Sequence, residues 1–152
     1  MEDYLSIKSK IIRFSIIYTI FFILFTSCED ERVNIIPYVY VNTTIDMQNP
    51  VYIDLLNVGG SSYINYEGYN GNGIIVYHSG IDEYKAYDRT CTFQVQNSCA
   101  IETNENSFIT AICPCCESEF ELSYGTVSKG PAFAPLKEYR TSFDGSILHI
   151  YN

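Results

Sequence analysis

An alternation of apolar and polar side chains with a period of two, present from residue 38 onward, limits what this chain can fold into. Residues 38–46, YVYVNTTID, place valine, threonine and isoleucine at every second position. Side chains of a strand point alternately to its two faces, whereas those of a helix repeat about every 3.6 residues. No segment after residue 37 carries a helical stripe of that kind, so the period predicts an all-β domain.

Turn-forming stretches rich in Gly, Asn, Asp, Ser and Pro divide this part of the chain into short segments, roughly ten residues apart. The last two segments flank Asp144-Gly145, a dipeptide typical of a two-residue hairpin turn. We therefore expect small antiparallel sheets. The expected strands cover residues 38–46, 51–56, 61–66, 74–77, 83–87, 107–112, 137–143 and 146–151.

The N-terminal segment has the layout of a secretory signal rather than of a folded element. Basic residues at positions 8, 10 and 13 precede an apolar run over residues 14–25. The run leads into Thr26-Ser27-Cys28, which resembles a bacterial lipobox, in which a Cys after small residues is diacylated and becomes the mature N-terminus. A plain signal anchor with an incidental Cys28 is the alternative.

Cleavage before Cys28 would divide the chain into three parts. These are a signal peptide over residues 1–27, a lipidated tether over residues 28–37 and a folded domain over residues 38–152. Two acyl chains are enough for stable membrane anchoring. The acidic Glu29-Asp30-Glu31 resembles an export signal found after the lipidated Cys in some Gram-negative lineages. We expect an outer membrane lipoprotein on the periplasmic or the cell-surface side.

The charge and the residue types exclude several classes of function. Without residues 1–27, six basic and 16 acidic residues remain, a net charge of −10, and nucleic-acid binding needs clustered basic residues. The chain has two His, and His78 is expected in a solvated turn. It has no G-x-S-x-G motif, phosphate loop or metalloprotease helix. We expect a protein that is not an enzyme, whose partners are the membrane, through its lipid, and an unidentified envelope protein.

Five cysteines remain once Cys28 is set aside, and they fall in two loops that each follow an expected strand. The first loop comes after strand 83–87, and the second comes after strand 107–112. Two Cys-bearing loops at strand ends predict a site. The first loop contains Cys91 and Cys99, and the second contains Cys113, Cys115 and Cys116.

These loops resemble those of the Rieske family of iron–sulfur domains, which read C-x-H and C-P-x-H and hold a [2Fe–2S] cluster between them. Cys113-Pro114-Cys115, followed by residues 118–122, is similar to the second loop and its exit strand. Residues 125–131 and 135–139 resemble the proline loop and the return strand. The resemblance covers roughly residues 50–152. It implies a Rieske-like fold of small antiparallel sheets and, for an intact site, electron transfer.

The ligand positions differ from the family's pattern. Phe93 stands where the first His is expected, Cys116 stands where the second His is expected, and Glu117 replaces the usual Gly. A phenyl ring has no lone pair, so the His-ligated iron of an ordinary Rieske centre cannot form here. The resemblance also implies a disulfide, because Cys99 and Cys115 correspond in order to the pair bridged beside the cluster in some Rieske proteins.

Three hypotheses for the cysteines stay open. In the first, Cys91, Cys113 and Cys116 ligate a [2Fe–2S] cluster, with Cys99 or another group as the fourth ligand. In the second, the same three thiolates hold Zn²⁺. In the third, no cofactor is bound, Cys99 pairs with Cys115, and Cys91 pairs with Cys113 or Cys116. We expect the third, in an envelope lipoprotein that acts as a non-catalytic scaffold or binding module. The alternative is an iron–sulfur electron carrier re-ligated by cysteines.

Overall fold

The computed structural model describes residues 35–152 of the chain. The expected signal peptide over residues 1–27 and the expected lipidation site Cys28 lie outside this part. Among the described residues, no helix combines the length and the apolar character that crossing a membrane requires.

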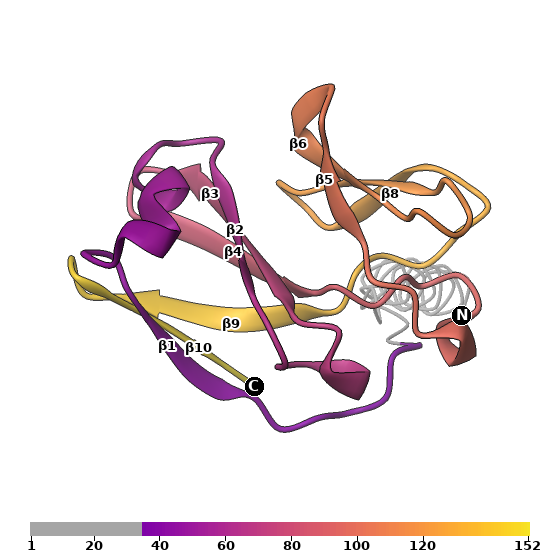
Figure 1. Cartoon of the computed structure of the whole chain (residues 1–152), viewed down its shortest axis with the longest axis horizontal. Coiled ribbons are helices and arrows are strands. Elements are labelled where there is room, and N and C mark those ends of the chain that lie inside the picture. Colours follow the sequence, from indigo (N-terminus) through magenta and orange to yellow (C-terminus); the bar gives the residue numbers. More distant parts are fainter. Residues whose placement is uncertain (1–34) are drawn as a thin grey trace, which may run out of the picture. The chain divides into compact units, whose positions relative to one another are not determined.

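Two antiparallel sheets build the domain (Figure 1). The larger sheet has the strand order β1-β10-β9-β4-β3-β2, and the smaller has the order β5-β6-β7-β8. The expected all-β architecture of small antiparallel sheets is therefore confirmed. The strands are β1 (Asn42–Asp46), β2 (Ser61–Ile64), β3 (Ile74–Gly80), β4 (Glu83–Asp88), β5 (Glu102–Asn104), β6 (Ser107–Ile112), β7 (Glu119–Glu121), β8 (Thr126–Lys129), β9 (Glu138–Phe143) and β10 (Ile147–Tyr151).

One expected strand is a helix instead. Residues 51–56 belong to the 3₁₀ helix η1 (Pro50–Leu56), so the strand predicted there is wrong. Asn49 caps the helix, because its side chain accepts a hydrogen bond from the backbone N–H of Val51, and Pro50 supplies the φ angle suited to a first turn. Short apolar runs do not distinguish a strand from a helix by period alone. The other short helices are η2 (Tyr69–Gly71) and η3 (Val95–Asn97).

Strand β3 also extends further than the sequence suggests. It continues to Gly80 and therefore contains His78, which is buried and stacks on Tyr84 with ring centroids 4.4 Å apart. The expected solvated turn at His78 is wrong, because the turn comes two residues later, between β3 and β4.

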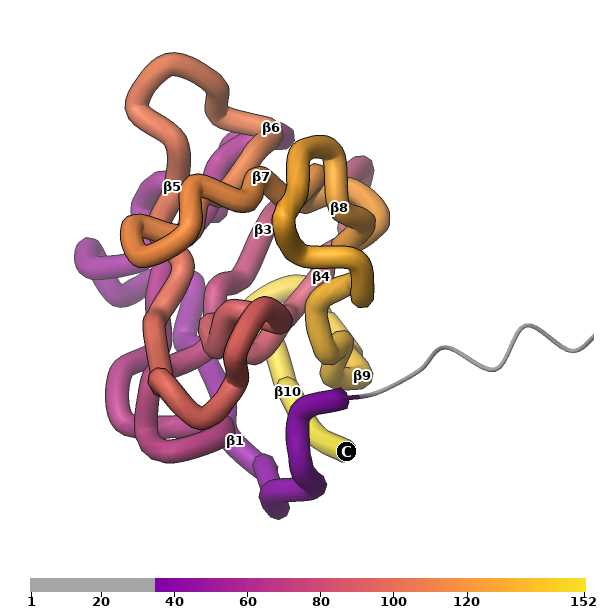
Figure 2. The backbone as a smooth tube through the Cα atoms, turned by 90° about the vertical axis from the view of Figure 1, so that its right-hand side faces the viewer, coloured from indigo at the N-terminus to yellow at the C-terminus, as the bar shows by residue number. Residues whose placement is uncertain are grey.

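Both faces of β3 are buried, one in each of two apolar cores. Ile74 and Val76 point into a core with β1, β10 and η1, whereas Ile75 and Tyr77 point into a second core with the smaller sheet. In Figure 2 the smaller sheet, drawn in orange, lies above β9, β10 and β1 of the larger sheet. A strand with two buried faces is apolar without alternation, which explains the sequence IIVY. The second core contains the Cys-bearing loops.

A buried carboxylate connects the larger sheet to the first of these loops. Asp88, at the end of β4, accepts hydrogen bonds from the backbone N–H of Thr90, at 2.9 Å, and of Tyr69, at 2.7 Å. It also accepts one from the hydroxyl of Tyr139 on β9, at 2.7 Å. Burial raises the pKa of Tyr139, and the charge of Asp88 raises it further, so the hydroxyl stays protonated and keeps donating.

We expect Tyr139→Phe to destabilise the domain by about 1–3 kcal/mol, because a buried carboxylate oxygen then loses a donor. The matched control is Tyr40→Phe, since the side chain of Tyr40 is 68% exposed and makes no contact with Asp88. Urea denaturation followed by circular dichroism measures both variants. Equal midpoints for the two variants would contradict the role assigned to Asp88.

Candidate functional site

Two loops carry the five cysteines of the described chain. Loop 1, residues 89–101, connects β4 to β5, and loop 2, residues 113–118, connects β6 to β7. Loop 1 is closed at its base, because the N–H of Ile101 donates to the carbonyl of Arg89 at 2.6 Å. Further along, the N–H of Cys91 donates to the carbonyl of Cys99 at 2.8 Å. The two arms of loop 1 are therefore hydrogen-bonded to each other in the manner of paired strands.

Loop 2 is a tight turn between paired strands. The N–H of Cys113 donates to the carbonyl of Ser118 at 2.9 Å, and the N–H of Glu117 donates back to the carbonyl of Cys113 at 2.8 Å. Glu117 has a φ of 59°, in the left-handed region that favours glycine. Glu117, which stands in place of the glycine of the resembled pattern, therefore adopts a backbone conformation that favours glycine.

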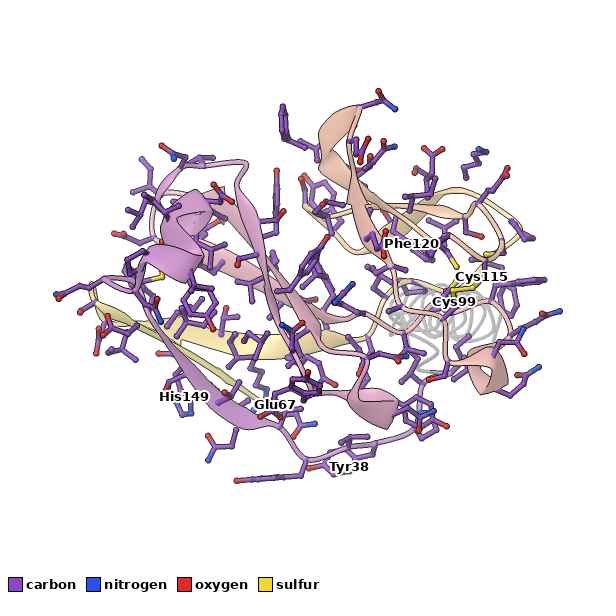
Figure 3. All side chains as sticks on the ribbon, viewed as in Figure 1. Tyr38, Glu67, Cys99, Cys115, Phe120 and His149 are labelled. Carbon is purple, nitrogen blue, oxygen red and sulfur yellow. A yellow bond between two sulfur atoms is a disulfide. The ribbon has the colours of Figure 1, made fainter. Side chains whose placement is uncertain are left out.

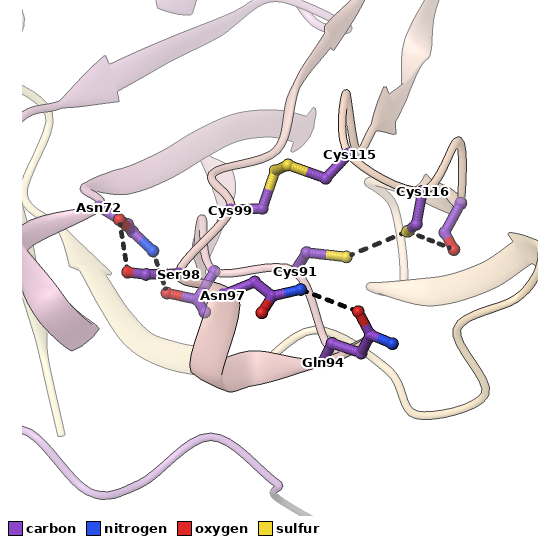
Figure 4. The surroundings of a disulfide bond; sticks show 10 residues. Asn72, Cys91, Gln94, Asn97, Ser98, Cys99, Cys115 and Cys116 are labelled. Carbon is purple, nitrogen blue, oxygen red and sulfur yellow. Dashed lines mark hydrogen bonds between the residues drawn. A yellow bond between two sulfur atoms is a disulfide. The ribbon is translucent and has the colours of Figure 1, made fainter.

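A disulfide between Cys99 and Cys115 joins loop 1 to loop 2 (Figure 4). This is the pair that the resemblance implies. Phe120 belongs to the apolar core that Cys99 packs against, and Figure 3 labels Phe120 beside the two bridged cysteines. The two loops are therefore fixed to each other at one side of the site.

The other three cysteines have free thiols that lie together. The sulfurs of Cys91 and Cys116 are 3.6 Å apart, and those of Cys91, Cys113 and Cys116 all lie within 4.8 Å of one another. Cys91 and Cys113 are buried, whereas Cys116 is half-buried. The sulfur of Cys113 also lies within 4.8 Å of the sulfurs of Cys99 and Cys115. The five cysteines predicted to form the site thus form one continuous group of sulfur atoms.

The thiols differ in how readily they lose a proton. Burial raises the pKa of Cys91, and its contact with Cys113 adds to this effect. Burial also acts to raise the pKa of Cys116, but hydrogen bonds from the hydroxyl and the backbone N–H of Ser118, together with those from the thiols of Cys113 and Cys91, outweigh it and lower this pKa. The Ser118 oxygen lies 3.1 Å from the Cys116 sulfur. A negative charge in the group is therefore best held at Cys116.

A third segment, residues 130–136, is hydrogen-bonded to both loops. The hydroxyl of Thr92 in loop 1 donates to the carbonyl of Ala134 at 2.7 Å, and the N–H of Ala132 donates to the hydroxyl of Ser118 in loop 2 at 2.9 Å. Thr92 and Ser118 are both buried. This segment overlaps the end of the proline loop, residues 125–131, and the start of the return strand, residues 135–139, that the resemblance marks, but the resemblance gives no signal for the link between Thr92 and Ala134.

Phe93 lies in loop 1 two residues after Cys91. Its ring is half-buried and packs against the same apolar core as Cys91 and Cys113. A ring in this place adds apolar surface beside the thiols and no ligand atom.

We expect Cys116 to react with iodoacetamide in the folded protein before Cys91 and Cys113, because it is half-buried where the other two are buried and its pKa is lowered. Ser118→Ala raises that pKa and slows alkylation at neutral pH, and the difference disappears at alkaline pH, where the thiolate forms in both proteins. Peptide mass spectrometry after timed alkylation measures the rates. Ser123→Ala, in the turn after β7, is the control, and equal rates for the two variants at neutral pH would contradict the assignment.

No family model and no curated protein matches this chain. Among solved structures, it is similar to the plasma membrane Rieske protein PetC3 of the cyanobacterium Synechocystis PCC 6803. The identity is 26% and the TM-score is 0.50 over 74% of this chain and 98% of that one.

Two further structures share the similarity at lower identity. The ferredoxin of carbazole 1,9a-dioxygenase from Nocardioides aromaticivorans IC177 is 17% identical, with a TM-score of 0.48 over 74% of this chain and 97% of that one. The Sphingomonas yanoikuyae B1 ferredoxin is 17% identical, with a TM-score of 0.47 over 65% and 93%. With its two sheets, its paired Cys-bearing loops and its likeness to PetC3, the described part of this chain is a Rieske-like domain.

Proposed function

We propose that this protein is an envelope lipoprotein whose Rieske-like domain does not hold a [2Fe–2S] cluster and acts as a non-catalytic scaffold or binding module. The fold and the similarity to PetC3 support the Rieske-like nature of the domain. The residue types at positions 91–118 support the proposed absence of a cluster. The lipobox at Cys28 supports the proposal that the protein is a lipoprotein.

The observation that carries the proposal is the packing of Phe93. A Rieske centre needs two thiolates on one iron and two imidazoles on the other. Phe93 stands at the position of the first imidazole, and its ring packs against the apolar core beside Cys91. It offers no electron pair to iron, so one of the four ligands is absent.

The position of Cys116 also argues against a cluster. In the family's pattern a His at this position would ligate one iron and the Cys at the position of Cys91 would ligate the other. The Cys116 sulfur instead lies 3.6 Å from the Cys91 sulfur, which is a spacing expected of two ligands on the same metal ion. The disulfide uses the two remaining cysteines. Three clustered thiols and a phenyl ring do not fit a [2Fe–2S] cluster.

The second candidate is a one-electron carrier in which cysteines re-ligate the cluster. The observation in its favour is that three free thiols lie within 4.8 Å of one another. Such a centre would need a fourth ligand, which a reduced Cys99 would supply. All-thiolate ligation would give a potential nearer about −400 mV than the range of about −150 to +300 mV of His-ligated centres.

The proposed attachment is a lipid at Cys28 in the outer membrane, facing the periplasm or the cell surface. The net charge of −10 expected for the mature chain disfavours binding to anionic lipid, so the acyl chains would supply the attachment. An envelope protein is the proposed partner.

Replacing the predicted lipid carrier tests the anchor. We expect Cys28→Ala to leave the membrane fraction, or to stay uncleaved, and to incorporate no labelled fatty acid, because the acylated side chain is gone. Cys116→Ala is the control and keeps both the label and the membrane location. Wild-type protein that is freely soluble and unlabelled would contradict the lipoprotein proposal.

Restoring the imidazoles tests the account of the ligands. We expect the double variant Phe93→His/Cys116→His to take up about two irons per chain with visible absorbance during anaerobic reconstitution, because it then has two thiolates and two imidazoles. Wild type treated identically, and Phe93→His alone, serve as matched controls and stay below that stoichiometry. A double variant that shows the wild-type circular dichroism spectrum but binds no iron would contradict the account.

A further inference from the structure

The three free thiols of the two loops form a ligand set of their own. We infer that Cys91, Cys113 and Cys116 bind one Cu(I) ion through three sulfur atoms. The inference rests on the proposed absence of a [2Fe–2S] cluster from the same loops.

The spacing of the sulfurs suits one ion. Sulfurs bound at about 2.3 Å to a single metal ion lie about 4 Å apart. The Cys91 and Cys116 sulfurs are 3.6 Å apart, and no two of the three are further apart than 4.8 Å. In Figure 4 the side chains of Cys91 and Cys116 point toward each other beside the disulfide. Small rotations of these side chains are enough to surround an ion.

The number and type of donors select the metal. Among residues 35–152, no fourth His, Cys, Asp or Glu lies within the same distance of all three sulfurs. Zn²⁺ is almost always four-coordinate in structural sites, whereas thiolates are soft donors that also select Cu(I), which is stable with three of them. Apolar side chains, including those of Phe93, Phe120 and Leu122, pack around the group and limit water as a fourth ligand.

Covalent and hydrogen bonds fix the backbone around the three thiols before an ion binds. The disulfide fixes loop 1 to loop 2, and the N–H of Cys91 and of Cys113 each bond within their own loop. Binding therefore costs little additional ordering of the backbone. Half-buried Cys116 gives the ion an entry point, and buried Cys91 and Cys113 shield it from solvent.

Binding involves no change of oxidation state. Each thiol that binds as a thiolate releases its proton to solvent, copper remains Cu(I), and the Cys99–Cys115 disulfide is not reduced. Three sulfur–copper bonds form, and the sulfur–hydrogen bonds of the participating thiols break.

Anaerobic titration of the full-length protein with Cu(I), against the chelator bicinchoninate, tests the inference. We expect one Cu(I) per chain with a near-ultraviolet thiolate-to-copper band. Cys113→Ser and Cys116→Ser should each weaken binding by about 100-fold or more. Even the loss of a hydrogen-bond partner of a metal ligand lowers metal affinity by up to about 100-fold, and these variants lose a ligand itself. Met47→Leu is the matched control, because it removes a soft sulfur from the other core and should leave binding unchanged. Circular dichroism confirms that each variant is folded.

Each of the following titration results would overturn the inference: no Cu(I) retained against the chelator, unchanged binding in folded Cys116→Ser, or displacement of Cu(I) by equimolar Zn²⁺. A disulfide between Cys91 and Cys116 in protein isolated without oxygen would overturn it too. Two irons and two sulfides per native chain would overturn both this inference and the proposed function. An iron-free protein that binds no Cu(I) overturns this inference alone.

Discussion

The buried carboxylate of Asp88 is the interaction on which the arrangement of sheet and site depends. It ends β4 and accepts hydrogen bonds from β9, from η2 and from the first residues of loop 1. Removing a charged group from water is costly unless donors surround it. Asp88 thus fixes the position at which the chain leaves β4 and continues to Cys91. The disulfide then joins loop 1 to loop 2, which the paired strands β6 and β7 of the smaller sheet hold in place.

The scaffold and the ligands of this domain follow separate physical requirements. The scaffold needs apolar faces on β3, paired strands and the links from Thr92 and Ser118 to residues 130–136, and these are all present. The ligands need atoms with lone pairs at four positions, and Phe93 supplies none. A Rieske-like fold can therefore persist where its usual cofactor chemistry does not, because packing does not depend on the imidazoles.

Much of the fold could be predicted from the sequence because alternation and turn residues act locally. The last two strands and β6 follow their patterns closely, and the two Cys-bearing loops come directly after the strands expected before them. The strand predicted over residues 51–56 is wrong, since these residues form a helix that depends on the cap from Asn49 rather than on a period. The very short β5 carries too few residues for a pattern to emerge.

The site was less predictable than the fold. The resemblance to Rieske loops pointed to Cys99 and Cys115 as a pair, but the spacing of the cysteines left the other pairings open. That Cys91 and Cys116 lie 3.6 Å apart depends on the left-handed turn at Glu117 and on the hydrogen bond to Ser118, which are tertiary and turn-level features. The burial of His78 likewise depends on a sheet face that the sequence around it does not identify.

The most direct test of the central claim is the iron and acid-labile sulfide content of wild-type protein purified from its own envelope without oxygen. The account predicts a colourless protein with far less than one iron per chain, in which Cys99 and Cys115 are bridged. About two irons and two sulfides per chain, with visible absorbance that is lost in Cys113→Ala, would contradict it.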